Sequence, residues 1–209
     1  MQTLIINAHP DPRNKTAYCT NRLVDCLTEK LPDATVLNLY NEDIPELTAE
    51  TLPVFNGAYS GDGKDAELSK GAQHFLARNA ELLEQFKAAD RVIIAMPMHN
   101  FTVTSRLKDY LDNIIVPGQT FQYTREGPQG LVGGHKALLV QSSGSVYSTG
   151  PLAPWEQSYP FLQTAFGMLG FDSTDIVRAE GTMDPNIGPD VAVERACAEL
   201  EQKLPEFLA

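Results

Sequence analysis

The sequence has few cysteines, few basic residues and no long hydrophobic run. It contains three cysteines and no CxxC motif, which argues against a disulfide framework or structural zinc and favours a reducing, cytoplasmic setting. Its 16 Lys and Arg against 27 Asp and Glu give a net charge of -11, which disfavours nucleic acid and anionic membrane surfaces as partners. No apolar run approaches the roughly 18 residues of a membrane span, and no secretory signal is visible.

The length and hydrophobic content predict one globular domain spanning residues 1–209. At 43% hydrophobic residues, a chain of this size can bury a substantial core. Cys19 and Cys26 lie seven residues apart, on one face of a predicted helix. We expect both to be packing thiols, because free cysteine is readily buried.

Apolar runs and helical periods alternate along the chain. The predicted strands are Thr3–Asn7, Ala34–Leu39, Arg91–Met96, Lys136–Gln141 and Asp172–Val177, and the predicted helices are Thr16–Lys30, Lys70–Ala89, Ser105–Val116, Glu156–Leu169 and Pro189–Leu204. This order predicts an α/β fold with a doubly wound parallel sheet, helices on both faces and right-handed crossovers. Tyr40–Ser69 has no convincing period, and Phe121–Leu131 could form a small hairpin; for both segments a functional role and mere decoration stay open.

In an open parallel sheet, ligands bind beyond the carboxyl ends of the strands. The first predicted strand is followed by a proline-stiffened loop that starts at His9. Asn14 or Thr16 could cap the next helix, whose exposed amides suit a phosphate, and Arg13 and Lys15 add positive charge. An ordinary capped loop is the alternative. The segment is neither a P-loop nor a GxGxxG motif.

Two further loops follow predicted strands. The third strand ends in Ala-Met-Pro, without the aspartate that a phospho-acceptor domain of this architecture requires, and leads into the amide-bearing segment 97–101. The fourth strand leads into segment 142–147, whose small hydroxyl residues and Gly144 let the backbone approach a ligand. Together the three loops favour a planar, phosphorylated cofactor.

Three blocks of sequence resemble one known family. Pro97–Phe101 (PMHNF), Leu107–Asp112 (LKDYLD) and Thr120–Leu131 (TFQYTREGPQGL) are similar to the FMN-dependent NAD(P)H azoreductases, within the wider flavodoxin-like quinone reductase family. Ala8–Pro12 (AHPDP) resembles the quinone reductase branch more closely. The resemblance covers essentially the whole chain. It implies a flavodoxin-like five-stranded sheet of order 2-1-3-4-5, a homodimer, and active sites at the dimer interface.

The same resemblance assigns site residues. It places the FMN phosphate near Asn14, Lys15 and Thr16, with His9 at the loop entrance. It places one edge of the flavin ring against Met98, His99, Asn100 and Phe101, and another edge against Ser142, Ser143, Gly144 and Ser145. The chain departs from the family in three ways: the family commonly has Tyr at position 99, often has a Ser-Arg-Gly-Gly-like stretch at 142–145, and has more serine in its phosphate loop.

The implied activity is two-electron transfer from NADH or NADPH through FMN to a quinone or azo compound, in ping-pong order. One open slot serves both substrates, so no dinucleotide motif is needed. His99 and Tyr123 are the candidate proton or hydrogen-bond donors, since the unperturbed pKa of histidine is about 6.5; simple packing is the alternative for His99. A role in the slot, in a dimer contact or in the core is open for Phe121, Trp155, Tyr159 and Phe166. The alternative function is a flavodoxin-type electron carrier, whose acidity would suit basic partners.

Overall fold

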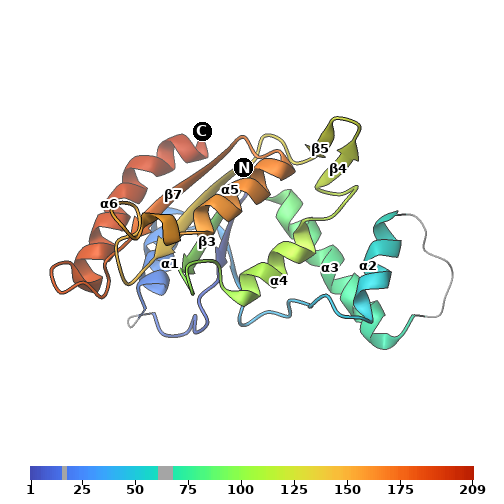
Figure 1. The fold of residues 1–209 in the computed structure, drawn as a ribbon, viewed down its shortest axis with the longest axis horizontal. Coiled ribbons are helices and arrows are strands. Elements are labelled where there is room, and N and C mark those ends of the chain that lie inside the picture. The colour runs from blue at the N-terminus through green and yellow to red at the C-terminus, as the bar shows by residue number, and fades with distance from the viewer. Residues whose placement is uncertain (16–17, 61–67) are drawn as a thin grey trace.

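A five-stranded parallel sheet forms the centre of the protein (Figure 1). The computed structural model describes residues 1–15, 18–60 and 68–209. The sheet consists of β1 (Thr3–Asn7), β2 (Thr35–Asn38), β3 (Arg91–Pro97), β6 (Lys136–Ser142) and β7 (Ser173–Ala179). Its order is β2-β1-β3-β6-β7, and every pair of neighbours is parallel. Counting only these strands, this is the 2-1-3-4-5 order, which confirms the predicted fold class.

Helices cover both faces of the sheet. They are α1 (Cys19–Lys30), α2 (Thr51–Ser60), α3 (Lys70–Ala88), α4 (Ser105–Ile114), α5 (Ser158–Leu169) and α6 (Gly188–Leu208), with a 3-10 turn, η1, at Ala153–Trp155. Core residues of α1 and α6 cluster with Ile5 and Ile93, whereas those of α3, α4 and α5 cluster with Leu4 and Ile94. Successive strand residues therefore enter opposite cores, which explains the nearly continuous apolar runs.

Helix α1 begins later than the sequence indicated. Its first residue is Cys19, and Tyr18 before it is extended and makes no side-chain capping bond. The expectation that Asn14 caps this helix is therefore wrong, because the chain has not yet turned into the helix at that position; Thr16 lies outside the described residues. Cys19 and Cys26 are half-buried free thiols packed against the core, as predicted.

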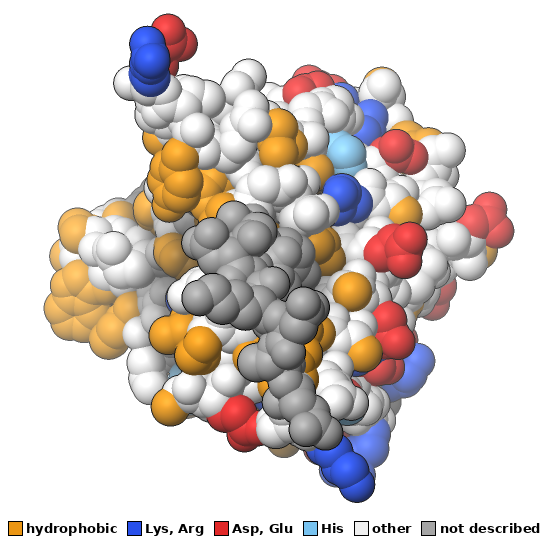
Figure 2. All heavy atoms as spheres, turned by 90° about the vertical axis from the view of Figure 1, so that its right-hand side faces the viewer, with side chains coloured by type: hydrophobic (Ala, Val, Ile, Leu, Met, Phe, Trp, Pro, Cys, Tyr) orange, Lys and Arg blue, Asp and Glu red, His pale blue; other side chains and the backbone are white. Residues whose placement is uncertain are grey.

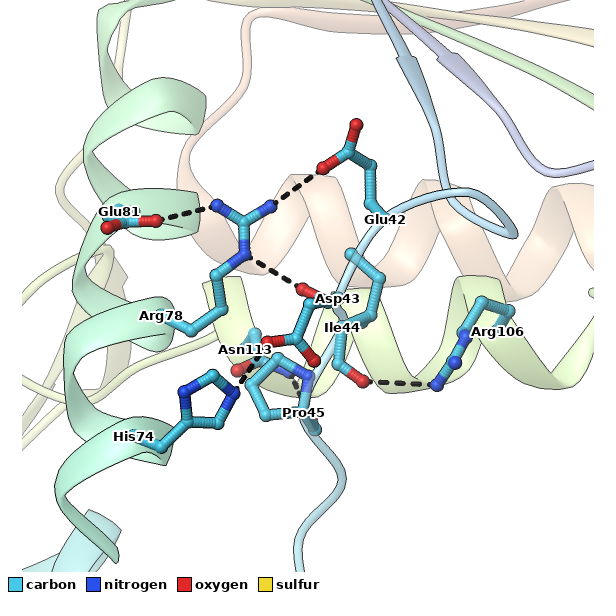
Figure 3. A network of polar contacts seen from close by, with 9 residues as sticks. All are labelled: Glu42, Asp43, Ile44, Pro45, His74, Arg78, Glu81, Arg106 and Asn113. Carbon is cyan, nitrogen blue, oxygen red and sulfur yellow. Dashed lines mark hydrogen bonds and ion pairs between the residues drawn. The ribbon is translucent and has the colours of Figure 1, made fainter. Parts of the chain in front are cut away.

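The segment that follows β2 is fastened to α3 and α4 (Figure 3). The bonds run from Arg78 to the carbonyl of Asp43 (2.8 Å) and the carboxylate of Glu42 (3.2 Å), from Arg106 to the carbonyl of Ile44 (3.1 Å), and from Asn113 to the carbonyl of Pro45 (2.8 Å). Helix α2 follows, where no helix was predicted, and its Phe55 packs edge-on against Phe75 of α3. The first part of this segment therefore serves as structural cover.

The predicted hairpin is present and stands at the amino end of the sheet (Figure 1). Strands β4 (Phe121–Thr124) and β5 (Gly127–Gly130) form it, and the chain after it is anchored by Val132, whose N–H donates to the Leu169 carbonyl (3.1 Å). Figure 2 views the side of the molecule that carries the hairpin and α2, where hydrophobic side chains gather. Tyr123 on the hairpin is 76% exposed.

Both chain ends also lie at the amino edge. The Met1 amino group is 3.8 Å from a carboxylate oxygen of Asp90. The buried guanidinium of Arg91 donates to the carbonyls of Phe207 (2.6 Å), Asp90 (2.9 Å) and Gly134 (3.3 Å). These bonds hold the last turn of α6 beside the start of β3. In the part of the chain that the structure describes, no helix is long and apolar enough to cross a membrane.

Candidate active site

Three loops meet at the carboxyl edge of the sheet, as the sequence predicted. They follow the adjacent strands β1, β3 and β6 and comprise residues 8–15, 98–102 and 142–147. The N–H of Met98 donates to the Ser142 carbonyl (2.8 Å), and the Thr104 hydroxyl donates to the Ala8 carbonyl (3.2 Å). The hydroxyls of Thr20 and Ser142 are 2.7 Å apart and buried. The three loops are thus tied together as one surface.

The first loop presents cationic side chains beside a buried histidine. The His9 ring lies 4.3 Å from the Tyr18 ring, and its Nδ1 accepts a bond from the Asp11 N–H (3.0 Å). Burial lowers the pKa of His9 below its ordinary value, which favours the neutral ring that can accept this bond. An open pocket is lined by Asp11, Arg13, Asn14 and Lys15. His9 therefore shapes the loop, while Arg13 and Lys15 are exposed and form surface ion pairs with Asp11 (3.2 Å) and Asp25 (2.9 Å).

Two buried asparagines, Asn7 and Asn21, hold this loop together with the half-buried Asn38, and sequence reasoning missed all three. Asn7 Nδ2 donates to Oδ1 of Asn21 and to Oδ1 of Asn38, both at 3.1 Å. Asn7 Oδ1 accepts from the His9 N–H (3.0 Å), and Asn21 Nδ2 donates to the carbonyls of Asp11 (2.8 Å) and Asn14 (2.9 Å). The sequence did contain one signal for this cluster: two neighbouring strands each end in an asparagine. These residues, Asn7 and Asn38, lie opposite each other in the sheet register.

The second loop is a tight turn with unusual backbone geometry. His99 and Thr102 exchange two backbone bonds (2.9 and 3.1 Å), and the residues between them, Asn100 and Phe101, have φ of 46° and 70°. Asparagine adopts this left-handed region more readily than phenylalanine. The turn leaves His99 and Asn100 exposed and Phe101 43% exposed. Backbone strain of this kind is concentrated at ligand sites.

The third loop has an inner and an outer part. The hydroxyl of Ser142 is paired with Thr20, and that of Ser143 donates to the Ser145 carbonyl (2.9 Å). Ser142 and Ser143 therefore help to build the loop. Gly144 and Ser145 lie nearer the surface, and a Cβ on Gly144 would come within 3.1 Å of the Met183 sulfur. The Met183 side chain therefore fills the space beside Gly144 that a Cβ would need.

Tyr123 does not join this site within one chain. It lies on β4, at the amino end of the sheet, whereas His99 and the three loops lie at the carboxyl end (Figure 1). The Tyr123 ring packs edge-on against Phe121, with centroids 5.2 Å apart. The assignment of Tyr123 as a catalytic group therefore stays a prediction that requires a second copy of the chain.

Two features of the site fit flavin mononucleotide. The first is the open pocket beside Asn14 and Lys15, close to the start of α1, which suits a phosphate. The second is the exposed backbone and ring of the turn after β3, where Phe101 is 43% exposed, next to the loop that follows the adjacent strand β6. A flat heterocycle needs such close contacts with backbone and ring edges, so the residues present suit the cofactor.

The chain is similar to known proteins over its full length. A family model described as flavodoxin-like fold matches residues 1–204. The chain is 38% identical to FMN-dependent NADH:quinone oxidoreductase 1 of Lactiplantibacillus plantarum, over 99% of this chain and 98% of that protein. It is also 38% identical to the FMN-dependent NADH:quinone oxidoreductase of Streptococcus agalactiae, over 87% of each.

A solved structure gives the same result. The FMN-dependent NADH-azoreductase of Bacillus anthracis, determined in complex with FMN, superposes with a TM-score of 0.89, at 32% identity and 100% coverage of both chains. The chain therefore belongs to the flavodoxin-like family that contains the FMN-dependent NADH:quinone oxidoreductases and NADH-azoreductases.

Proposed function

We propose that the protein binds FMN and uses NADH to reduce quinones and azo compounds by two-electron transfer. The observation that carries this proposal is the joining of three loops at the carboxyl ends of β1, β3 and β6 into one surface. The names of the related proteins, which include FMN and NADH, support it. The bound flavin would supply the redox chemistry, and the protein supplies position and electrostatics.

Different residues would bind the phosphate end and the ring end of the cofactor. Arg13, Asn14 and Lys15, with the amino end of α1, would hold the phosphate. Segments 98–101 and 142–145 would orient the ring and shield its edges from water. His99 is exposed on the turn and within reach of solvent protons. We assign it the donation of a proton or hydrogen bond to the acceptor at the exposed face of the site.

We propose that the working unit is a homodimer in the cytoplasm. Two observations support the dimer: Tyr123 is 76% exposed and far from the site of its own chain, and Trp155, beside that site, is 54% exposed. A second copy would cover these rings and bring Tyr123 toward the neighbouring site. The three free thiols suit a reducing compartment.

The test is a spectrum followed by an assay. The purified protein should be yellow, and its released chromophore should have the mass of FMN. It should oxidise NADH with a quinone, and separately bleach an azo dye, through many turnovers per flavin. A flavodoxin-type carrier would hold the flavin without this turnover, and a colourless protein that binds no added FMN would refute both functions.

A matched pair of variants ties the result to the site. Asn100→Trp places a bulky ring in the turn proposed to contact the flavin, so flavin content should fall. Asn56→Trp makes the same change on the exposed surface of α2 and should leave flavin content unchanged. Full flavin occupancy in Asn100→Trp would count against the assigned turn.

A further inference from the structure

Glu156 is a buried carboxylate between the two loops that are proposed to hold the flavin ring. It lies between η1 and α5 and is 7% exposed. Its Oε1 accepts three hydrogen bonds: from the N–H of Ser158 (2.8 Å), the N–H of Tyr159 (3.0 Å) and Nε2 of Gln141 (3.1 Å). Bonds to an ionised acceptor are stronger than neutral ones, so this carboxylate is a firm anchor point.

One of these bonds connects Glu156 to the third loop. Gln141 is the penultimate residue of β6 and is fully buried, and the loop continues directly from Ser142. The bond from Gln141 therefore fixes the carboxylate to the base of segment 142–147. Because β6 is an inner strand, paired with β3 and β7, in a sheet that is covered on both faces, this base is a rigid reference point.

The residues on either side of Glu156 contact the second loop. The N–H of Gln157 donates to the Phe101 carbonyl (2.8 Å), and the Trp155 ring lies edge-on to the Phe101 ring, with centroids 5.3 Å apart. Phe101 has a φ of 70°, a conformation that phenylalanine keeps only when its surroundings impose it. Segment 155–157 supplies both a backbone bond and a ring contact that do so.

We propose that Glu156 is a positioning residue that fixes segment 98–102 relative to segment 142–147. This inference rests on the proposed flavin site, and it assigns to that site a residue which does not itself touch the cofactor. With the carboxylate removed, segment 155–157 loses its tie to β6, and the turn at Phe101 loses its fixed support. A flavin ring held between the two loops would then be bound less tightly. Its surroundings would also change, and with them the flavin midpoint potential.

The simpler role for Glu156 is to cap α5, because two of its three bonds go to the first amides of that helix. A helix cap contributes to stability. Loss of a cap alone would therefore lower the melting temperature but would not change FMN affinity. Ser69 offers the matched control: its hydroxyl caps α3 by accepting from the Ala72 N–H (3.1 Å), away from the three loops. Ser69→Ala should lower the melting temperature and leave FMN affinity unchanged.

The experiment compares Glu156→Ala, Glu156→Gln, Gln141→Leu and Ser69→Ala in the full chain. We would measure melting temperature, the Kd for FMN, the flavin midpoint potential, and kcat and KM separately. Glu156→Ala should weaken FMN binding about tenfold, which corresponds to about 1.4 kcal/mol, and should shift the potential. Glu156→Gln keeps an acceptor oxygen and should restore most of the affinity. Gln141→Leu breaks only the tie to β6 and should reproduce the weakened binding while keeping the cap.

A readout without FMN separates this inference from the proposed function. Trp155 is the sole tryptophan of the sequence, so intrinsic fluorescence of the apoprotein reports directly on segment 155–157. Its emission maximum and anisotropy should change in Glu156→Ala and Gln141→Leu but not in Ser69→Ala. If wild type binds no FMN, the proposed function fails, while the fluorescence still tests the loop tie. Unchanged fluorescence, Kd and potential in Gln141→Leu would overturn the inference and leave Glu156 as a cap.

Discussion

Asn21 lies in the first turn of α1, yet its side chain serves the loop that precedes the helix. It donates to the carbonyls of Asp11 and Asn14 and accepts from Asn7. We expect Asn21→Ala to lower the unfolding free energy by about 2 kcal/mol, because two loop carbonyls lose bonds worth roughly 1 kcal/mol each. FMN affinity should fall as well, since the phosphate loop loses its support.

The control for Asn21→Ala is on the same helix. The Thr28 hydroxyl makes only a local bond, to the Asp25 carbonyl (2.9 Å). Thr28→Ala should therefore leave the FMN Kd unchanged. Denaturant unfolding and FMN titration measure both variants. Equal FMN affinity in Asn21→Ala and wild type would refute the supporting role.

At this same scale, the sequence predicted the site loops but not the groups that hold them. A buried Asn7 or Asn21 has the same local sequence signal as an asparagine in an exposed turn. The two asparagine partners of Asn7 are 14 and 31 residues away along the chain, so only the fold brings these amides together. The same holds for Glu156, which sequence reasoning treated only as the first residue of a predicted helix.

At the scale of elements, the hairpin depends on two glycines that meet backbone to backbone. A Cβ on Gly130 would lie 2.2 Å from the Gly170 nitrogen and the Leu169 carbonyl carbon. Gly130→Ala should force β5 away from the end of α5 and cost about 2 kcal/mol, the usual range for overpacking. Turnover should fall because Tyr123 moves with the hairpin, whereas flavin content should stay unchanged.

Gly133→Ala is the matched control, because a Cβ there finds only the Gly170 oxygen at 3.8 Å, an ordinary contact. Calorimetry and NADH:quinone assays distinguish the two variants. A Gly130→Ala protein with wild-type stability would contradict the close approach. A stability loss accompanied by loss of flavin would contradict the separation of the hairpin from the flavin loops of the same chain.

The regular elements were largely predictable from the sequence. The sheet strands agree with their predicted limits within two residues, because strands covered on both faces need continuous apolar runs. Helix α2 was not predicted. It contains Pro53 and Gly57 and lacks a clear helical period, and its contact with α3 through Phe55 and Phe75 is tertiary. A helix stabilised mainly by such contacts leaves a weak local signal.

At the scale of the whole molecule, the separation of Tyr123 from His99 makes a dimer testable by mixing two variants that are each impaired in turnover. Asn100→Trp should lack flavin, and Tyr123→Ala should bind flavin but turn over slowly. In a mixed dimer, the flavin site of the Tyr123→Ala chain would receive an intact Tyr123 from the other chain. We therefore expect activity to reappear on mixing and to decline on dilution.

Steady-state assays and size-exclusion chromatography provide the measurement. Two copies of the same variant, mixed in the same way, serve as the control and should gain nothing. A monomeric protein with full activity, or no recovery on mixing, would contradict the assignment of Tyr123 to the neighbouring site.

The position of both chain ends has a practical consequence. Met1 and Phe207 lie at the amino edge of the sheet, whereas the three loops lie at the opposite edge. A linker attached at either end would project away from the loops. The protein should therefore tolerate immobilisation on a surface through either end without the tether crossing the loops of the same chain.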